Sequence, residues 1–316
     1  MKVVSLFSGA GGADLGFDKE GYNIVFATDI DPDCNRTYNK NFSTVQRPYT
    51  VQYVNECVKK GIMNFKGTDV VIGGPPCQSF SMIRVRGKLN CDGLVNVHDM
   101  QEFVKNAQPK IFICENVASI FKISMLHIHM DFMIGFQNAG YKVDAYTLNT
   151  EDFGIPQTRK RAFYIGVRND LAESGVKFRI PELTHWNKEY TGWLNYLNSK
   201  LGYDKTRMGV YIKRASDVAG RLPEEAAFTI TGAERPCIRS IKNSGISRGV
   251  QMNTASRMMK GVEQRYLTLD ELKALQGFSQ DFSFEGGIVS IRKQIGNAWS
   301  VPVARALAKQ IKLTLS

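Results

Sequence analysis

Short apolar runs alternate with polar, helix-like segments along the first half of the chain. The runs "KVVSLF", "YNIVFATD", "TDVVIGG", "KIFIC" and "RAFYIGV" are continuously apolar, and they do not alternate with polar positions. Continuous runs of this length are typical of strands that helices cover on both faces. The pattern therefore predicts a doubly wound α/β fold with a mostly parallel sheet.

The pattern changes after about Arg168, where the segments become shorter, more polar and richer in glycine and basic residues. We expect a smaller domain of short strands and loops in this part. Helical patterning then returns in "LTLDELKALQGF", where Thr268 and Glu271 have the spacing of a capping box and Gly277 suits the helix end. The predicted division is residues 1–172 for the α/β domain, 173–275 for the small domain and 276–316 for a segment that returns to the first domain.

Composition indicates a folded protein in a reducing compartment. The chain has 316 residues, of which 43% are hydrophobic, and it contains neither an apolar run of membrane-spanning length nor a recognisable leader. Its six cysteines form no CxxC pair, so no metal site is predicted. We expect Cys34, Cys57 and Cys114 to be buried hydrophobic residues and the protein to be cytoplasmic.

The charge is strongly basic and unevenly distributed. The formal net charge is +11, and residues 205–260 contain eleven Lys/Arg against four Asp/Glu. A solvated basic face is the ordinary explanation for a charge run, but an excess confined to one segment favours a polyanionic partner. Nucleic acid is the commonest such partner.

A glycine-rich turn follows the first predicted strand in "LFSGAGGADLGF". Gly9, Gly11 and Gly12 allow the backbone to approach a ligand closely, at the start of a helix whose N–H groups are free. Asp29 closes the second strand, where an acid can accept hydrogen bonds from ribose hydroxyls. The turn predicts a nucleoside-containing cofactor, and it does not by itself distinguish NAD from S-adenosylmethionine.

A cysteine follows two glycines and two prolines in "VVIGGPPCQSFS". Pro75 and Pro76 fix their own φ and restrict the residues before them, so the loop that leaves this strand is rigid. The loop lies at the carboxyl end of a strand, where such sheets bind ligands. A buried structural cysteine needs no rigid support. The arrangement therefore predicts that Cys77 is a nucleophile held at a fixed position.

With these motifs in place, the chain resembles the C5-cytosine DNA methyltransferases of bacterial or phage restriction–modification systems. The resemblance runs almost end to end and in the family's order. It rests on "LFSGAGGADLGF", "GGPPCQSFS", "ENV" from Glu115, "QTRKR" from Gln157, "RYLTLDELKALQGF" and "QIGNAWSVPVARAL". It implies a Rossmann-like methyltransferase fold with a small DNA-recognition domain, S-adenosylmethionine as cofactor and double-stranded DNA as substrate.

The resemblance also implies roles for individual residues. Cys77 is expected to attack C6 of a flipped cytosine, Glu115 to act at N3, and Arg159 and Arg161 to favour the thiolate and grip the target. The residues expected to bind the cofactor are Phe7, Gly9, Ala10, Gly11, Gly12, Asp29, Ile30, Asn55, Gly74, Pro76, Asn297 and Ala298. Those expected to contact DNA are Gln78, Ser81, Thr229, Ile230, Arg235 and Arg239.

Two stretches depart from the family pattern. The usual Gly-Asp-Ile before the cysteine loop is missing, so Asn55 is taken as the nearest substitute for its acid, and the loop after Cys77 lacks a common Asp-Pro-Arg-Gly stretch. Three other functions therefore remain open: an RNA cytosine methyltransferase, a nicotinamide-dependent oxidoreductase, and a DNA-binding protein with weak catalysis. We further expect a monomer that acts alongside a cognate restriction endonuclease.

Overall fold

A computed structural model describes residues 1–76, 94–184, 193–201, 210–213, 226–231, 237–240 and 264–316. These residues form two compact units, and neither follows the chain continuously. The first unit contains Met1–Leu148, Lys160–Glu182 and Val303–Ser316, and the second contains Asn149–Arg159 and Leu183–Pro302. The three-part division expected from the sequence stays a prediction, because compactness alone does not test which parts fold or function as domains.

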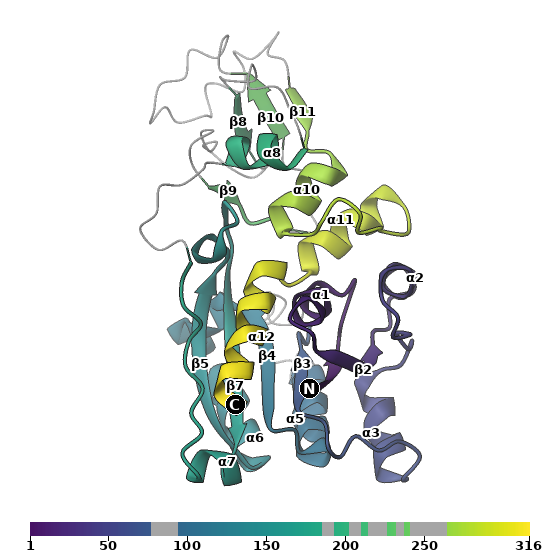
Figure 1. The fold of residues 1–316 in the computed structure, drawn as a ribbon, viewed down its shortest axis with the longest axis vertical. Helices are drawn as coiled ribbons and strands as arrows, with labels where there is room; N and C mark the ends of the chain where they lie inside the picture. Colours follow the sequence, from purple (N-terminus) through teal and green to yellow (C-terminus); the bar gives the residue numbers. More distant parts are fainter. Residues whose placement is uncertain (77–93, 185–192, 202–209, 214–225, 232–236, 241–263) are drawn as a thin grey trace. The chain divides into compact units, whose positions relative to one another are not determined.

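The first unit is a six-stranded sheet with helices on its faces (Figure 1). Its strands are β1 Lys2–Leu6, β2 Asn23–Thr28, β3 Val70–Gly73, β4 Ile111–Val117, β5 Tyr141–Asn149 and β7 Lys160–Arg168. Its helices are α1 Gly12–Lys19, α2 Pro32–Asn41, α3 Val51–Lys59, α5 Val95–Ala107, α6 Leu126–Asn138, α7 Asn169–Glu173 and α12 Val301–Leu315, with short 3-10 turns at Ala118–Phe121 and Ile123–Met125.

The strand order of this sheet is β2-β1-β3-β4-β7-β5. The pairs β1–β2, β1–β3 and β3–β4 are parallel, whereas β7 runs antiparallel to β4. The predicted doubly wound, mostly parallel sheet is therefore confirmed. The chain passes from β1 to one side and returns to the other side through β3, so the order reverses between these two strands. Sheets of this kind bind ligands outside the carboxyl ends of the strands at such a reversal.

Both faces of the sheet are buried, as the continuous apolar runs require. Along β1, the side chains of Val4 and Leu6 join a core formed with α3, α5 and α6. Ser5 lies between them in sequence and points to the other face, where its hydroxyl contacts α1. Burial on both sides fixes the register, because a slip of one residue would exchange the two sets of side chains.

The last helix packs directly on the first. A Cβ added to Gly16 of α1 would lie 2.6 Å from the Cβ of Ala304 and 2.7 Å from the backbone nitrogen of Arg305, so only glycine permits this approach. The hydroxyl of Tyr22, just after α1, donates to the Ala308 carbonyl oxygen at 2.8 Å. The expected apolar stripe of α12 is confirmed at Ala304, Ala308 and Ile311, which are fully buried.

The second unit contains small sheets and short helices. Its described elements are η4 Thr150–Phe153, β6 Gln157–Thr158, α8 Trp193–Leu201, β8 Val210–Lys213, β9 Ala227–Phe228, β10 Cys237–Ser240, β11 Gln264–Tyr266, α10 Leu269–Gln276 and α11 Ile288–Asn297. The strands form a three-stranded sheet in the order β11-β10-β8 and a parallel pair β6-β9. A separate core of α8, α10 and α11 residues, including Leu197, Leu275 and Ile295, holds this unit together.

Helix α10 begins and ends as its sequence predicts. The Thr268 hydroxyl accepts from the Glu271 backbone N–H at 3.2 Å, and the Glu271 carboxylate accepts from the Thr268 N–H at 2.7 Å, which completes the capping box. Gly277 ends the helix at φ 92°, a left-handed conformation that favours glycine. Within the described ranges, no helix combines the length and the apolar character that crossing a bilayer requires.

Candidate active site

The turn after β1 has an unusual backbone conformation. Phe7, Gly9 and Gly11 have positive φ angles of 51°, 54° and 89°. A positive φ at Phe7 is strained, because its Cβ crowds the backbone, and strain of this kind often marks a functional site. Gly11 has a packing reason as well, since an added Cβ would lie 2.4 Å from the Phe42 ring. At Gly9 an added Cβ would meet nothing within 4 Å.

Hydrogen bonds from the end of β2 hold this turn in place. The Gly9 N–H donates to Asp29 Oδ2 at 2.9 Å, and the other carboxylate oxygen of Asp29 accepts from the Asp31 N–H at 2.9 Å. The Ser8 N–H and hydroxyl both donate to the Thr28 carbonyl, at 3.1 and 3.0 Å. The predicted pairing of the glycine turn with Asp29 is thus a direct contact, and it places a carboxylate at the carboxyl ends of β1 and β2.

Helix α1 starts immediately after the turn. Its N-cap residue is Gly11, and no side chain of the described part of the chain caps its first N–H groups. Ala10 and Gly12 are buried and form the base of the turn. The uncapped helix start offers N–H donors to a negatively charged group. Ile30, next to Asp29, is 67% exposed and leaves an apolar side chain at the same edge of the sheet.

A buried carboxylate lies behind the turn, in the second position after the glycines. Asp14 is fully buried, and its two oxygens accept from the Ser5 hydroxyl at 3.0 Å and the Tyr38 hydroxyl at 2.9 Å. Burial away from water disfavours the charged form, so the pKa of Asp14 rises from 3.8 to about 6, although both hydroxyl donors oppose this change. The same burial raises the pKa of Tyr38.

The proline loop leaves β3 beside the glycine turn. Gly73 ends the strand where an added Cβ would lie 2.9 Å from the Met100 sulfur, so packing requires glycine at this position. Pro75 is buried, and its carbonyl oxygen accepts from Asn116 Nδ2 at 3.3 Å. Asn116, at the end of β4, is itself 3% exposed. Gly74 and Pro76 continue the loop, and Cys77, Gln78 and Ser81 lie outside the described residues.

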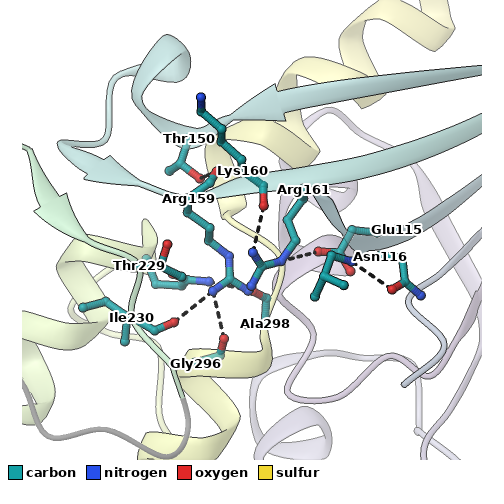
Figure 2. Close-up of polar contacts among 12 residues, drawn as sticks. Glu115, Asn116, Thr150, Arg159, Lys160, Arg161, Thr229, Ile230, Gly296 and Ala298 are labelled. Carbon is teal, nitrogen blue, oxygen red and sulfur yellow. Dashed lines mark hydrogen bonds and ion pairs between the residues drawn. The ribbon is translucent and has the colours of Figure 1, made fainter. Parts of the chain in front are cut away.

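Glu115 and Arg161 form an ion pair at the same edge of the sheet. Glu115 is near the end of β4, and Arg161 is near the start of β7, the antiparallel neighbour of β4. Arg161 Nε lies 3.1 Å from Glu115 Oε1, and both side chains are mostly buried (Figure 2). Asn116 follows Glu115, so this short segment contacts both the cysteine loop and an arginine. The sequence motif identified Glu115 and Arg161 but gave no sign that they pair.

Arg159 belongs to the second unit and makes different contacts. It is 2% exposed, and its guanidinium donates to the carbonyl oxygens of Ile230 at 2.9 Å, Gly296 at 3.0 Å and Ala298 at 3.0 Å (Figure 2). Gln276 also donates to the Ala298 carbonyl, at 2.6 Å. The sequence predicted that Arg159 contacts the target, whereas these bonds direct its guanidinium to the backbone of its own unit.

The predicted DNA-contacting pair Thr229–Ile230 is tied to the "QTR" segment. Ile230 is 2% exposed, and its N–H donates to Gln157 Oε1 at 2.9 Å. The Thr229 hydroxyl donates to the Thr158 carbonyl at 2.5 Å. Arg239 lies on β10, paired with Tyr211 and Gln264, and Arg235 lies outside the described residues. Contact between DNA and any of these predicted residues stays a prediction.

Three predicted cofactor residues lie apart from the glycine turn in the chain's organisation. Asn297 and Ala298 belong to the second unit, and their contact with a cofactor stays a prediction. Asn55 is buried on α3, where its Nδ2 donates to the Asp99 carbonyl at 2.8 Å. The segment bonded to the end of β2 comes earlier, since the Thr28 hydroxyl donates to the Arg47 and Tyr49 carbonyls at 2.9 and 2.6 Å.

Sequence reasoning missed the residues that hold the loops. Asn116 and Gln157 stand inside motifs that were recognised, but no role was assigned to them. Gln46 has no motif at all, although its amide bonds the glycine turn. A buried amide gives no periodic signal, and its partner is often a backbone group far away in the sequence. Such residues become visible only when the hydrogen bonds are known.

Comparison with known proteins agrees with this geometry. The model of the C-5 cytosine-specific DNA methylase family matches residues 1–313, so the chain belongs to that family. The family prediction and the enzyme class, a DNA (cytosine-5-)-methyltransferase, are thereby confirmed. The family generally uses S-adenosylmethionine.

Relatives with this similarity are known in several bacteria. The chain is 33% identical over 335 residues to the Type II methyltransferase M1.HphI of Haemophilus parahaemolyticus, covering 98% of this chain and 86% of the relative. It is 30% identical to M.FnuDI of Fusobacterium nucleatum, covering 100% and 95%. Among solved structures, the S. pombe Dnmt2 methyltransferase matches with a TM-score of 0.61 at 18% identity, covering 100% and 99%, which supports the fold.

Proposed function

We propose that this protein transfers a methyl group from S-adenosylmethionine to C5 of a flipped cytosine within a short specific site in duplex DNA. One observation carries the proposal. The strained glycine turn, the proline loop that leads to Cys77 and the Glu115–Arg161 pair all follow strands of one sheet at one edge. They bring together a site for a nucleoside, the approach to a nucleophile and a carboxyl group.

The residues around the glycine turn suit S-adenosylmethionine. Asp29 has a carboxylate whose oxygens retain lone pairs for ribose hydroxyls, and the uncapped start of α1 suits a carboxylate. The space beside Gly9 and the exposed Ile30 side chain suit a ring and its sugar. When bound, S-adenosylmethionine supplies a methyl group on a sulfonium. The remaining chemistry belongs to the chain's own residues.

Cytosine C5 is a weak nucleophile, so the chain has to activate it. In the proposed reaction the Cys77 thiolate adds to C6 and breaks the aromaticity of the ring, while Glu115 supplies a proton or hydrogen bond at N3, where negative charge develops. Once C5 carries the methyl group, a base removes the C5 proton, the C6–sulfur bond breaks and the thiolate is released. The carboxyl of Glu115 is kept in position by Arg161.

The two arginines receive different roles in this proposal. Arg161 lies beside Glu115 and is our candidate for contact with the flipped base or its phosphate. Arg159 already donates to three backbone carbonyls, so we assign it a structural role in the second unit, in place of the substrate contact that the sequence predicted. It would hold the segment around Ile230 to the Gly296–Ala298 segment.

The basic second unit is our candidate for DNA recognition. Residues 205–260 carry the largest excess of Lys and Arg, which would contact phosphates, while Arg235, Arg239, Gln78 and Ser81 are candidates for base contacts. The relatives named as Type II methyltransferases support a restriction–modification role, in which a cognate endonuclease cuts the same unmodified site. We propose a cytoplasmic monomer, since each duplex site offers one target base to one active site.

The test is methyl transfer itself. Purified protein is incubated with labelled S-adenosylmethionine and either mixed-sequence duplex DNA or duplex RNA, and modified cytosines are mapped by sequencing. We expect label only in DNA, at one cytosine of a recurring short site. Cys77→Ser should abolish transfer, whereas Cys34→Ser, a change at a buried cysteine of α2, should retain it.

Trapping of the adduct tests the nucleophile separately. Duplex DNA with 5-fluorocytosine at the mapped position should form a covalent complex with the wild type but not with Cys77→Ser, because fluorine blocks the final elimination. Methylation of RNA alone, or methyl transfer by Cys77→Ser at the wild-type rate, would contradict the proposal.

A further inference from the structure

Gln46 is a buried glutamine that contacts the glycine turn through its side chain. It is 1% exposed. Its Nε2 donates to the Ser8 hydroxyl at 2.8 Å and to the Gly9 carbonyl oxygen at 2.9 Å. Both hydrogens of the amide nitrogen are therefore used on two consecutive residues of the turn. The proposed chemistry assigns no role to this side chain.

The backbone around Gln46 is fixed as well. Its own N–H donates to Asn39 Oδ1 at 2.7 Å. The next residue, Arg47, forms a parallel bridge to Thr28, with its N–H donating to the Ala27 carbonyl at 2.9 Å. This short extension of the sheet edge places Gln46 beside the end of β2. The position of the amide is consequently determined by the sheet and not by the turn that it contacts.

Gly9 cannot satisfy its peptide groups in the sheet, because at φ 54° it has left the strand conformation. Two side chains take over this task. Asp29 accepts from its N–H at 2.9 Å, and Gln46 donates to its carbonyl oxygen at 2.9 Å. An acceptor and a donor thus hold opposite ends of one residue. Asp29 alone would fix the N–H and leave the carbonyl free to rotate.

A relay of hydrogen bonds extends this contact to β2. The Ser8 hydroxyl accepts from Gln46 and donates to the Thr28 carbonyl at 3.0 Å. The Gln46 Oε1 is buried and has no hydrogen-bond partner among the residues that the structure describes. A buried amide left half satisfied costs stability, and such a cost is tolerated where the other half of the group has a function.

We infer that Gln46 is a positioning residue for the cofactor: it fixes the Gly9 carbonyl and so keeps the turn in the conformation that binds S-adenosylmethionine. The inference rests on the proposed function, because it takes the turn as the cofactor site. It predicts that loss of the amide weakens cofactor binding and leaves the chemical step intact, since Gln46 touches neither Glu115 nor the proline loop in the described contacts.

The test replaces the amide with a group of similar shape. In Gln46→Met both donors are lost and the volume is nearly kept. We expect KM for S-adenosylmethionine and Kd for S-adenosylhomocysteine to rise about tenfold, the effect of about 1.4 kcal/mol, while kcat at saturating cofactor stays within about threefold. KM does not depend on how much of the enzyme is folded, so partial unfolding cannot imitate this result.

Gln101 provides a matched control. It is also a buried glutamine of the first unit, and its Nε2 donates to the Asp131 carbonyl at 3.2 Å, between α5 and α6. Gln101→Met should lower thermal stability without changing KM for the cofactor. Equal KM values for wild type and Gln46→Met, or the same rise in both variants, would overturn the inference.

A third arm separates this inference from the proposed function. Wild type and Asp29→Ala are titrated with S-adenosylhomocysteine by calorimetry. Failure of the wild type to bind would contradict the proposed function itself. Binding by wild type, weakened in Asp29→Ala but unchanged in Gln46→Met, would leave the function standing and reject the role of Gln46.

Discussion

At the scale of single residues, the site depends on buried polar groups whose partners lie far away in sequence. Asp14 is the clearest case, because it lies in the helix that follows the glycine turn and bonds both β1 and α2. Tyr38 in turn stacks on Phe42, and the Phe42 ring occupies the space that a side chain at position 11 would need. The carboxylate is therefore part of the support of the turn.

Asp14 makes stability depend on pH. Its pKa is 3.8 unfolded and about 6 folded, so the folded protein disfavours the ionised form. The contribution of this group to stability is most favourable below pH 4 and is lost as the pH rises through 6. Asp14→Asn removes this loss. We expect the unfolding free energy of the variant, relative to wild type, to improve by about 1 kcal/mol between pH 5 and pH 8.

Urea unfolding at both pH values measures this difference. Hydrogen bonds lost in Asp14→Asn shift both values equally and cancel in the comparison. A variant whose stability relative to wild type is the same at pH 5 and pH 8 would contradict the prediction, as would a change in the opposite direction.

Glu115 has a predicted kinetic signature. Glu115→Gln keeps the shape and can still accept a hydrogen bond from Arg161, but it removes the titratable proton. We expect kcat to fall by about 10²–10⁴, the usual contribution of a general acid or base. Kd for duplex DNA, measured by fluorescence anisotropy, should stay within about threefold. A variant with wild-type turnover would show that the carboxyl group does no proton chemistry.

At the scale of elements, the sequence predicted those features that rest on local rules. The capping box of α10, its glycine end and the stripe of α12 are all present. Ser300 shows the limit of local rules. It directly precedes α12, where a serine usually caps, yet its hydroxyl finds no partner within the described residues. The burial of Arg159 was missed for a related reason, because its three acceptors lie 71 to 139 residues away.

Two glycines at helix ends give a matched pair for testing packing. Gly277 and Gly175 have φ angles of 92° and 98°, so alanine is strained at both. Only at Gly277 would the Cβ also collide, at 2.4 Å, with the rigid ring of Pro302. We expect Gly277→Ala to lose about 1–3 kcal/mol more than Gly175→Ala in thermal unfolding, the usual cost of overpacking. Equal losses would mean that Pro302 moves aside freely.

At the scale of the whole molecule, charge governs the encounter with DNA. The net charge of +11 predicts binding that weakens steeply as salt rises, because each phosphate contact releases counterions. Plots of log K against log salt between 50 and 200 mM, for a duplex with the mapped site and one without, should both slope downward, with affinity at each salt higher for the site. A flat plot would show that phosphates contribute little.

The division of the chain was the part of the fold that sequence patterns could not give. Texture along the sequence suggested consecutive domains, whereas each compact unit collects separate stretches of chain. Apolar periodicity reports which face of an element is buried, but not which distant element covers it. The contact between α1 and α12 is an example, since it depends on a single glycine within a helix.

That contact has a consequence for biosynthesis. Helix α1 follows the glycine turn directly, and the residues that cover it are the last to be translated. A nascent chain still attached to the ribosome therefore has its first helix bare on one side, with Gly16 and Tyr22 open to water. The enzyme becomes competent only on release, so incomplete translation products cannot modify the genome.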